Sequence, residues 1–170
     1  LTEVKVRSRQ TNKPDKYIMS ECVKVLRDEL PYNLHIFVNS VDFIAKVIDT
    51  LKLAPEAVKV VCSTSGESRQ ENQRKLGKDY PIGQPSDPAK KINFYTSTCF
   101  EGCDIFDPDG VTFIVSDGRK AHTLLDISTL FTQICGRIRD SRYKAQIVHV
   151  YSTTKYLSLI HISEPTRRRE

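Results

Sequence analysis

Residues 92–116 read INFYTSTCFEGCDIFDPDGVTFIVS, with two apolar runs, at 92–97 and 111–116, on either side of a polar turn region. Each run is short, continuous and rich in β-branched and aromatic residues, which indicates a buried strand. Continuous apolar strands are typical of parallel sheets whose faces are covered by other elements. This stretch therefore predicts the middle of an α/β sheet.

The same alternation of short apolar runs and amphipathic segments extends from residue 34 to residue 151. Further strands are predicted at 35–38, 58–62 and 145–151, and a polar helix over 65–76 ends before Gly77. Apolar residues at helical spacing predict two more helices, one marked by Phe43, Ile44, Val47, Ile48 and Leu51 and a longer one by Leu124, Leu125, Ile127, Phe131, Ile134 and Ile138. The predicted fold class is α/β, an open, mainly parallel sheet of five strands with helices on both faces. Residues 1–30 predict a strand and a helix that form a lead-in element or linker.

Composition places the chain among globular proteins. Its 170 residues are 39% hydrophobic and 28% charged, with a mean hydropathy of -0.39, and no apolar run is long enough to span a bilayer, so no membrane partner is expected. The net charge of +5 is compatible with attraction to phosphate but does not establish it. Five cysteines and no leader segment predict reduced thiols and a cytoplasmic location, or the host compartment of replication for a viral or phage source. Because the chain starts at Leu1, it is predicted to be a fragment of a longer protein.

Three segments carry motifs: HIFVNS at 35–40, TSTCFEGCDI at 96–105 and QICGRIR at 133–139. In this order they resemble motifs IV, V and VI of superfamily 2 helicases of the DEAD/DEAH type. The Gln-x-x-Gly-Arg-x-Arg form of the third is most similar to helicases related to herpesvirus origin-binding proteins. The resemblance implies that residues 31–156 are the second, C-terminal RecA-like domain of an ATP-dependent helicase or translocase.

The resemblance also implies roles for particular residues. ATP with Mg²⁺ would be held mainly by a missing N-terminal RecA-like domain, and Arg137 would reach its γ-phosphate, a task suited to a planar, always charged guanidinium. The second arginine is Arg139 or Arg142, because Asp140 stands where the commoner family pattern has it. The residues expected near the nucleotide are Gln133, Gly136, Gly102 and Asp104, with Asp104 binding the ribose or orienting an arginine of motif VI. Those expected on the backbone of a single- or double-stranded nucleic acid, taken to be DNA, are Thr96, Ser97, Asn39 and Ser40.

Plainer interpretations exist for single residues. An isolated arginine such as Arg137 usually lies in solvent or pairs with a carboxylate, and Gly102 and Asp104 suit an ordinary turn. Cys99 and Cys103 lack a second Cys/His pair at metal-binding spacing, so no metal site is predicted. The histidines His35, His122 and His149 have no evident acid-base partner in the sequence and are predicted to be structural.

Absent motifs limit what this chain does alone. It contains no Gly-x-x-x-x-Gly-Lys-Ser/Thr phosphate loop and no acidic strand end of DEAD/DEAH type, so it is not expected to hydrolyse ATP by itself. Two alternatives stay open: a translocase that moves duplex DNA without separating its strands, and a non-catalytic nucleic-acid-binding or scaffold module. A Rossmann-type enzyme is disfavoured because no Gly-x-Gly-x-x-Gly follows a strand.

The last segment, 157–170, differs from the rest. Residues 157–167, LSLIHISEPTR, resemble the translation of a transposase adaptor used in DNA sequencing libraries. The segment is therefore predicted to be a non-native read-through tail and is left out of the fold. The alternative is a genuine basic tail ending in Arg167, Arg168 and Arg169.

Overall fold

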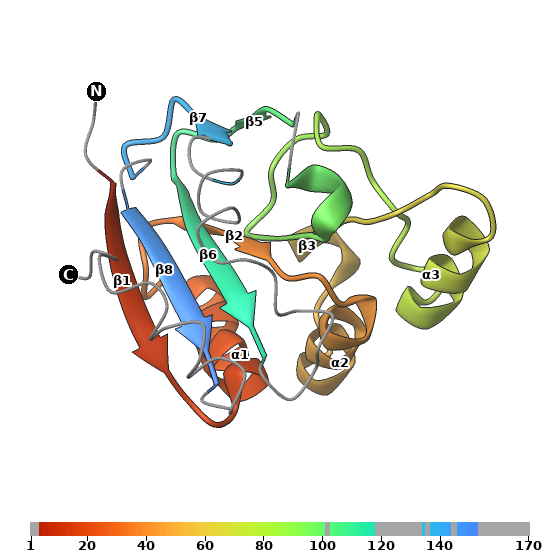
Figure 1. Cartoon of the computed structure of the whole chain (residues 1–170), viewed down its shortest axis with the longest axis horizontal. Helices are drawn as coiled ribbons and strands as arrows, with labels where there is room; N and C mark the ends of the chain where they lie inside the picture. Colours follow the sequence, from red (N-terminus) through yellow and green to blue (C-terminus); the bar gives the residue numbers. More distant parts are fainter. Residues whose placement is uncertain (1–3, 101–102, 118–133, 135–136, 144–145, 153–170) are drawn as a thin grey trace, which may run out of the picture.

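The computed structural model describes residues 4–100, 103–117, 134, 137–143 and 146–152. Six strands form one open sheet in the order β1-β8-β6-β2-β4-β3, and every neighbouring pair is parallel (Figure 1). The strands are β1 (Lys5–Gln10), β2 (Asn33–Phe37), β3 (Val58–Val61), β4 (Ile92–Tyr95), β6 (Gly110–Ser116) and β8 (Gln146–Tyr151). The predicted α/β class with an open, mainly parallel sheet is confirmed, and all five predicted strands are present.

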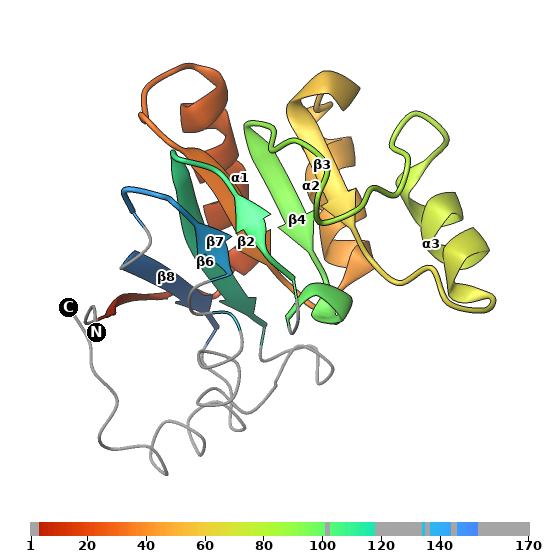
Figure 2. The same ribbon diagram turned by 90° about the horizontal axis from the view of Figure 1, so that it is seen from above.

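Helices cover one face of this sheet. α1 (Pro14–Leu26) and α2 (Val41–Leu51) lie together on the same side of the strands, as Figure 2 shows. A third helix, α3 (Ser68–Leu76), lies beside α2. The apolar stripe of α2 is buried in the main core, as its spacing predicts, and consists of Phe43, Ile44, Val47 and Ile48. The polar helix α3 buries only Leu76 and packs against α2 at the margin of the molecule beyond β3.

A smaller core lies on the other face. It is covered by a short ribbon of two parallel strands, β5 (Ile105–Phe106) and β7 (Ile138–Arg139), and by the 3-10 helix η2 (Ser97–Cys99) that follows β4. A second 3-10 helix, η1 (Pro55–Ala57), precedes β3. The buried side chains of this face include Phe37, Tyr95, Ile105, Ile114 and Ile138.

The ribbon corrects one prediction. The long helix expected up to Ile138 does not extend that far, because Ile138 pairs with Ile105 and both side chains are buried. Ile134 is helical and Arg137 has no regular structure. Most of the predicted helix lies outside the described residues. The predicted site residues Gly102, Gln133 and Gly136 lie outside them as well. The turn expected between residues 102 and 110 likewise contains β5.

Residues 5–10 are part of the sheet. All six residues of β1 pair with β8, and α1 packs against β2, β8 and α2, so the sheet has six strands rather than five. The signal in β1 is weak because Val6 alone is buried along this edge strand. The domain boundaries at residues 30/31 and 156/157 stay predictions, and the segment 157–170 lies outside the described residues.

The described cysteines are free thiols. Cys22, Cys62 and Cys99 are buried, and Cys103 is partly buried. Burial raises the pKa of Cys22 to about 12 and that of Cys62 to about 11, so neither is a thiolate at neutral pH. Within the described ranges, no helix combines the length and the apolar character of a membrane span, and no group of three or more Asp, Glu, His or Cys side chains is placed to hold a metal ion.

Candidate nucleic-acid interface

A groove of about 350 Å³ lies at the carboxyl ends of β2, β3 and β4. Parallel strands end at the same edge of a sheet, so the residues that follow each strand meet there, which is where open α/β sheets hold ligands. The residues that line the groove are Asn39, Ser40, Val41, Asp42, Ser63, Asn72, Lys75, Thr96, Ser97 and Thr98. All four residues that the motifs predict for nucleic-acid contact are therefore brought together in one groove.

The local structure gives these four residues different positions. Ser40 is the N-cap of α2, where its buried Oγ accepts a hydrogen bond from the Phe43 N–H at 3.1 Å. The Asn39 side-chain oxygen accepts from the Ser97 N–H at 3.4 Å, which connects the loops after β2 and β4. Thr96 is buried, whereas Ser97 is exposed on η2. Ser97 is thus the member of the set whose side chain is most open to a ligand.

Six of the ten lining residues were not among those predicted from the sequence: Val41, Asp42, Ser63, Asn72, Lys75 and Thr98. Asn72 Nδ2 donates to the Ser63 carbonyl at 3.0 Å and so fixes α3 to the end of β3. Lys75 Nζ lies 3.3 Å from Asp42 Oδ1 and brings a cation to the groove. The hydroxyl-rich run at 63–65 directly follows a predicted strand and could have indicated that Ser63 lines the groove. The polar pattern of α3 indicated only a solvated helix, so neither Asn72 nor Lys75 was predicted.

The arginines lie on and beside the β5–β7 ribbon. Arg139 Nε donates to Asp104 Oδ1 at 2.9 Å, and the two side chains are 50% and 54% exposed. Arg137 Nε donates to the Phe100 carbonyl at 3.2 Å, and Arg142 Nη2 lies 3.0 Å from Asp109 Oδ1. Of the two alternatives for the second arginine, it is Arg139 that pairs with Asp104. Whether Asp104 orients this arginine or binds the ribose of a nucleotide stays a prediction.

His35 has buried polar partners that are not evident in the sequence. His35 is fully buried, but its Nε2 lies 2.7 Å from Asp107 Oδ2 and its Nδ1 lies 2.8 Å from the Tyr95 hydroxyl. This pairing is not evident in the sequence because Asp107 is 72 residues away from His35. His149 Nε2 contacts Ser116 Oγ at 3.1 Å, and His122 lies outside the described residues.

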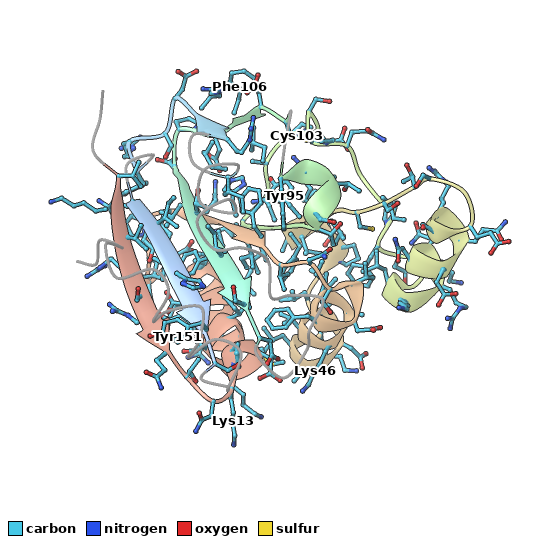
Figure 3. The ribbon with its side chains drawn as sticks, viewed as in Figure 1. Lys13, Lys46, Tyr95, Cys103, Phe106 and Tyr151 are labelled. Atoms are coloured by element: carbon cyan, nitrogen blue, oxygen red, sulfur yellow. The ribbon has the colours of Figure 1, made fainter. Side chains whose placement is uncertain are left out.

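One exposed apolar side chain also belongs to the ribbon. Phe106 is 66% exposed and pairs in register with Arg139, and Figure 3 shows it at the outer margin of the molecule, with Tyr95 in the interior. The opposite side of the ribbon buries Ile105 and Ile138. The ribbon therefore presents Phe106 and Arg139 to solvent from one face.

Comparison with solved structures identifies the fold. The chain is similar to the C-terminal domain of the DEAD-box protein Dbp5, with a TM-score of 0.51 and 15% sequence identity over 99% of this chain and 88% of that one. A Dbp5 variant of S. cerevisiae bound to RNA and ADP BeF3 is similar over 95% of this chain and 39% of that one, with a TM-score of 0.49 and 17% identity. Comparison of the sequence with protein-family models and with curated proteins finds no match. The chain thus has the RecA-like fold of a DEAD-box C-terminal domain.

Proposed function

We propose that this chain is the second RecA-like domain of an ATP-dependent nucleic-acid helicase or translocase. The observation that carries the proposal is the groove at the ends of β2 and β4, where the residues expected from two separate motifs meet. The similarity of the fold to a DEAD-box C-terminal domain supports the same class of protein.

The chemistry of the groove suits a nucleic-acid backbone. Ser97, Thr98 and Asn39 offer hydroxyl and amide groups, which bind phosphate oxygens and fix a strand without reading its bases. Lys75 adds a positive charge, and its partly exposed ion pair with Asp42 is weak enough for a phosphate to displace. We propose DNA as the strand, on the resemblance of motif VI; the Dbp5 structure described above holds RNA.

The ribbon suits the other ligand, the triphosphate of ATP with its Mg²⁺. The Arg139 side chain is half exposed and donates to Asp104 through Nε. Its two terminal nitrogens can therefore donate to a phosphate. Arg137 and Arg139 would stabilise the negative charge that develops during phosphoryl transfer, while the proposed N-terminal domain holds most of the nucleotide. ATP supplies the energy that closes and reopens the two domains.

A non-catalytic nucleic-acid-binding module is the second candidate. It is supported by the fact that the groove is built from residues of this chain. Absence of a phosphate loop from the complete protein would favour it over the first candidate. In a longer protein that carries a phosphate loop, Arg137→Ala is expected to abolish nucleic-acid-stimulated ATP hydrolysis and to leave ATP binding intact. Unchanged turnover would exclude Arg137 from catalysis.

The groove is tested by fluorescence anisotropy with single-stranded DNA and RNA oligonucleotides of about 10 nucleotides. Removal of one hydroxyl in Ser97→Ala is expected to weaken binding about 2- to 12-fold, because a typical hydrogen bond contributes about 0.5–1.5 kcal/mol. Lys75→Gln should also make the negative slope of log K against log salt shallower by about 0.7, the value for one phosphate contact on a single strand.

Lys24→Gln is the matched control. Lys24 also pairs with a carboxylate three residues away, Glu21, but on α1 and away from the groove lining. This variant should bind like the wild type. Equal affinities for all three variants would show that the groove does not bind the strand.

A further inference from the structure

The β5–β7 ribbon is too short to hold its own position. Each strand has two residues, and the backbone bonds that join them run from the Ile105 N–H to the Arg137 carbonyl at 2.8 Å and from the Asp107 N–H to the Arg139 carbonyl at 3.4 Å. Isolated two-stranded pairs are marginally stable, and a half-exposed ion pair such as Asp104 with Arg139 adds little. Other contacts must fix the place of the arginine.

The strongest of these contacts is made by Asp107, which directly follows β5. Its carboxylate is 4% exposed and accepts hydrogen bonds from His35 Nε2 at 2.7 Å, from Asn33 Nδ2 at 3.0 and 3.3 Å, and from the Asp109 N–H at 3.0 Å. His35 and Asn33 both belong to β2, in the interior of the sheet. The end of β5 is therefore anchored to a central strand by charge-assisted bonds.

The same network reaches the groove. The Tyr95 hydroxyl donates to His35 Nδ1 at 2.8 Å, and the two rings are stacked with an interplanar angle of 9°. Tyr95 is the last residue of β4, so Thr96 and Ser97 of the groove follow it directly. A path of buried polar contacts thus runs from the ribbon to Tyr95, and the chain continues from Tyr95 directly into the groove.

The protonation states fit this arrangement. Burial lowers the pKa of His35 against the opposing effect of Asp107, and the nearby Lys59 lowers it further. Burial alone would raise the pKa of Asp107, but the hydrogen bonds from His35, Asn33 and the Asp109 backbone outweigh it and lower the pKa. A neutral imidazole that donates from Nε2 and accepts at Nδ1 satisfies both neighbours.

Gly110 allows the close packing that the network needs. A Cβ at this first residue of β6 would lie 2.9 Å from His35 Cδ2 and 2.9 Å from Ile138 Cγ2. Only glycine lets the imidazole and β7 approach from both sides. The His35 ring and the arginine strand are therefore held against the same backbone position.

We propose that His35 and Asp107 are positioning residues that set the place of the Asp104–Arg139 pair relative to the groove. The role of Arg139 itself rests on the proposed function. The position of the ribbon, in contrast, is a property of this chain and is measurable without ATP or nucleic acid.

The test is ¹⁵N NMR with hydrogen exchange on the full chain carrying Asp107→Asn. An amide offers one acceptor oxygen in place of two, and its NH2 group faces the NH2 of Asn33. The Ile105 amide is expected to exchange at least about 10-fold faster, and the Arg139 Nε–H resonance to move toward that of a solvated arginine. The Leu34 and Val38 amides of the main sheet should keep their wild-type rates.

Asp15→Asn is the matched control. Asp15 is also a buried carboxylate with an ion pair, to Lys46 Nζ at 2.6 Å, but on α1. This variant should leave the exchange rate of the Ile105 amide and the resonance of the Arg139 Nε–H unchanged. If Asp107→Asn does not fold, Asn33→Ala removes fewer bonds and should give the same pattern with a smaller change.

Two results would overturn the proposal. One is an unchanged Ile105 amide and Arg139 Nε–H in Asp107→Asn, and the other is an equal rise in exchange across the main sheet, which would indicate a purely structural role. Failure of the wild-type chain to bind oligonucleotides would instead count against the proposed function. The two failures are therefore distinguishable.

Discussion

Replacing Ser40 by alanine tests how the groove is built. Ser40 is buried, and its Oγ accepts from the Phe43 N–H at 3.1 Å, so it satisfies one of the unpaired donors at the start of α2. Alanine leaves this N–H without its side-chain acceptor. Loss of an N-cap costs about 1 kcal/mol, within a range of about 0.5–2 kcal/mol. For a chain of this size, that corresponds to a fall in Tm of about 2–4 °C.

The assay is urea unfolding followed by circular dichroism. Ser40→Ala should lower the midpoint and leave the m-value unchanged, because the change removes a bond without altering the surface exposed on unfolding. Ser40→Thr is the control, since threonine also caps helices and should recover most of the loss. A midpoint equal to the wild type in Ser40→Ala, or an equal loss in both variants, would refute the capping role.

Three further predictions concern two buried polar side chains, His35 and Lys59, and the closely packed Gly110. The pKa of His35 is lower in the folded than in the unfolded chain, so the unfolded state binds the proton first as pH falls. The free energy of unfolding should therefore decline below about pH 6.5, by up to about 1.4 kcal/mol per pH unit. This slope should be smaller in His35→Gln. Identical slopes in urea titrations of the two proteins would contradict the shift. Lys59 Nζ donates to the carbonyls of Pro85 and Asp87 at 2.9 and 2.8 Å. Lys59→Met should therefore release the loop that contains Pro85 and Asp87 and speed its cleavage in limited proteolysis. An unchanged cleavage rate would count against this anchor. Gly110→Ala should destabilise the fold by about 1–3 kcal/mol through overpacking, and a wild-type urea midpoint would show that the neighbouring side chains move aside at no cost.

Most of the sheet was predictable from the sequence because its inner strands are continuous apolar runs. The strand over 111–116 is clear for this reason, since it is buried on both faces. The helix α2 is clear because it carries a complete apolar stripe. Edge strand β1 gives a weaker pattern, as a single buried valine among polar residues does not show whether a strand joins the sheet.

The ribbon was beyond sequence reasoning for a different reason. Two-residue strands are shorter than any periodic signal, and the pairing of Ile105 with Ile138 depends on contacts distant in the sequence. The same holds for the bond between His35 and Asp107. Four of the hydroxyl and amide residues of the groove, Asn39, Ser40, Thr96 and Ser97, were predicted because they follow motif-bearing strands. Lys75, in contrast, lies on a helix whose polar pattern is typical of a solvated surface.

Binding of a nucleic-acid strand is the function proposed for the groove. The most direct measurement is an NMR titration of the ¹⁵N-labelled chain with a single-stranded DNA oligonucleotide, repeated with RNA. We expect the largest amide shifts at Asn39, Ser97 and Thr98, with smaller ones at Lys75. Shifts confined to other surfaces, such as the edge of β1, or no shifts with either oligonucleotide, would contradict the account.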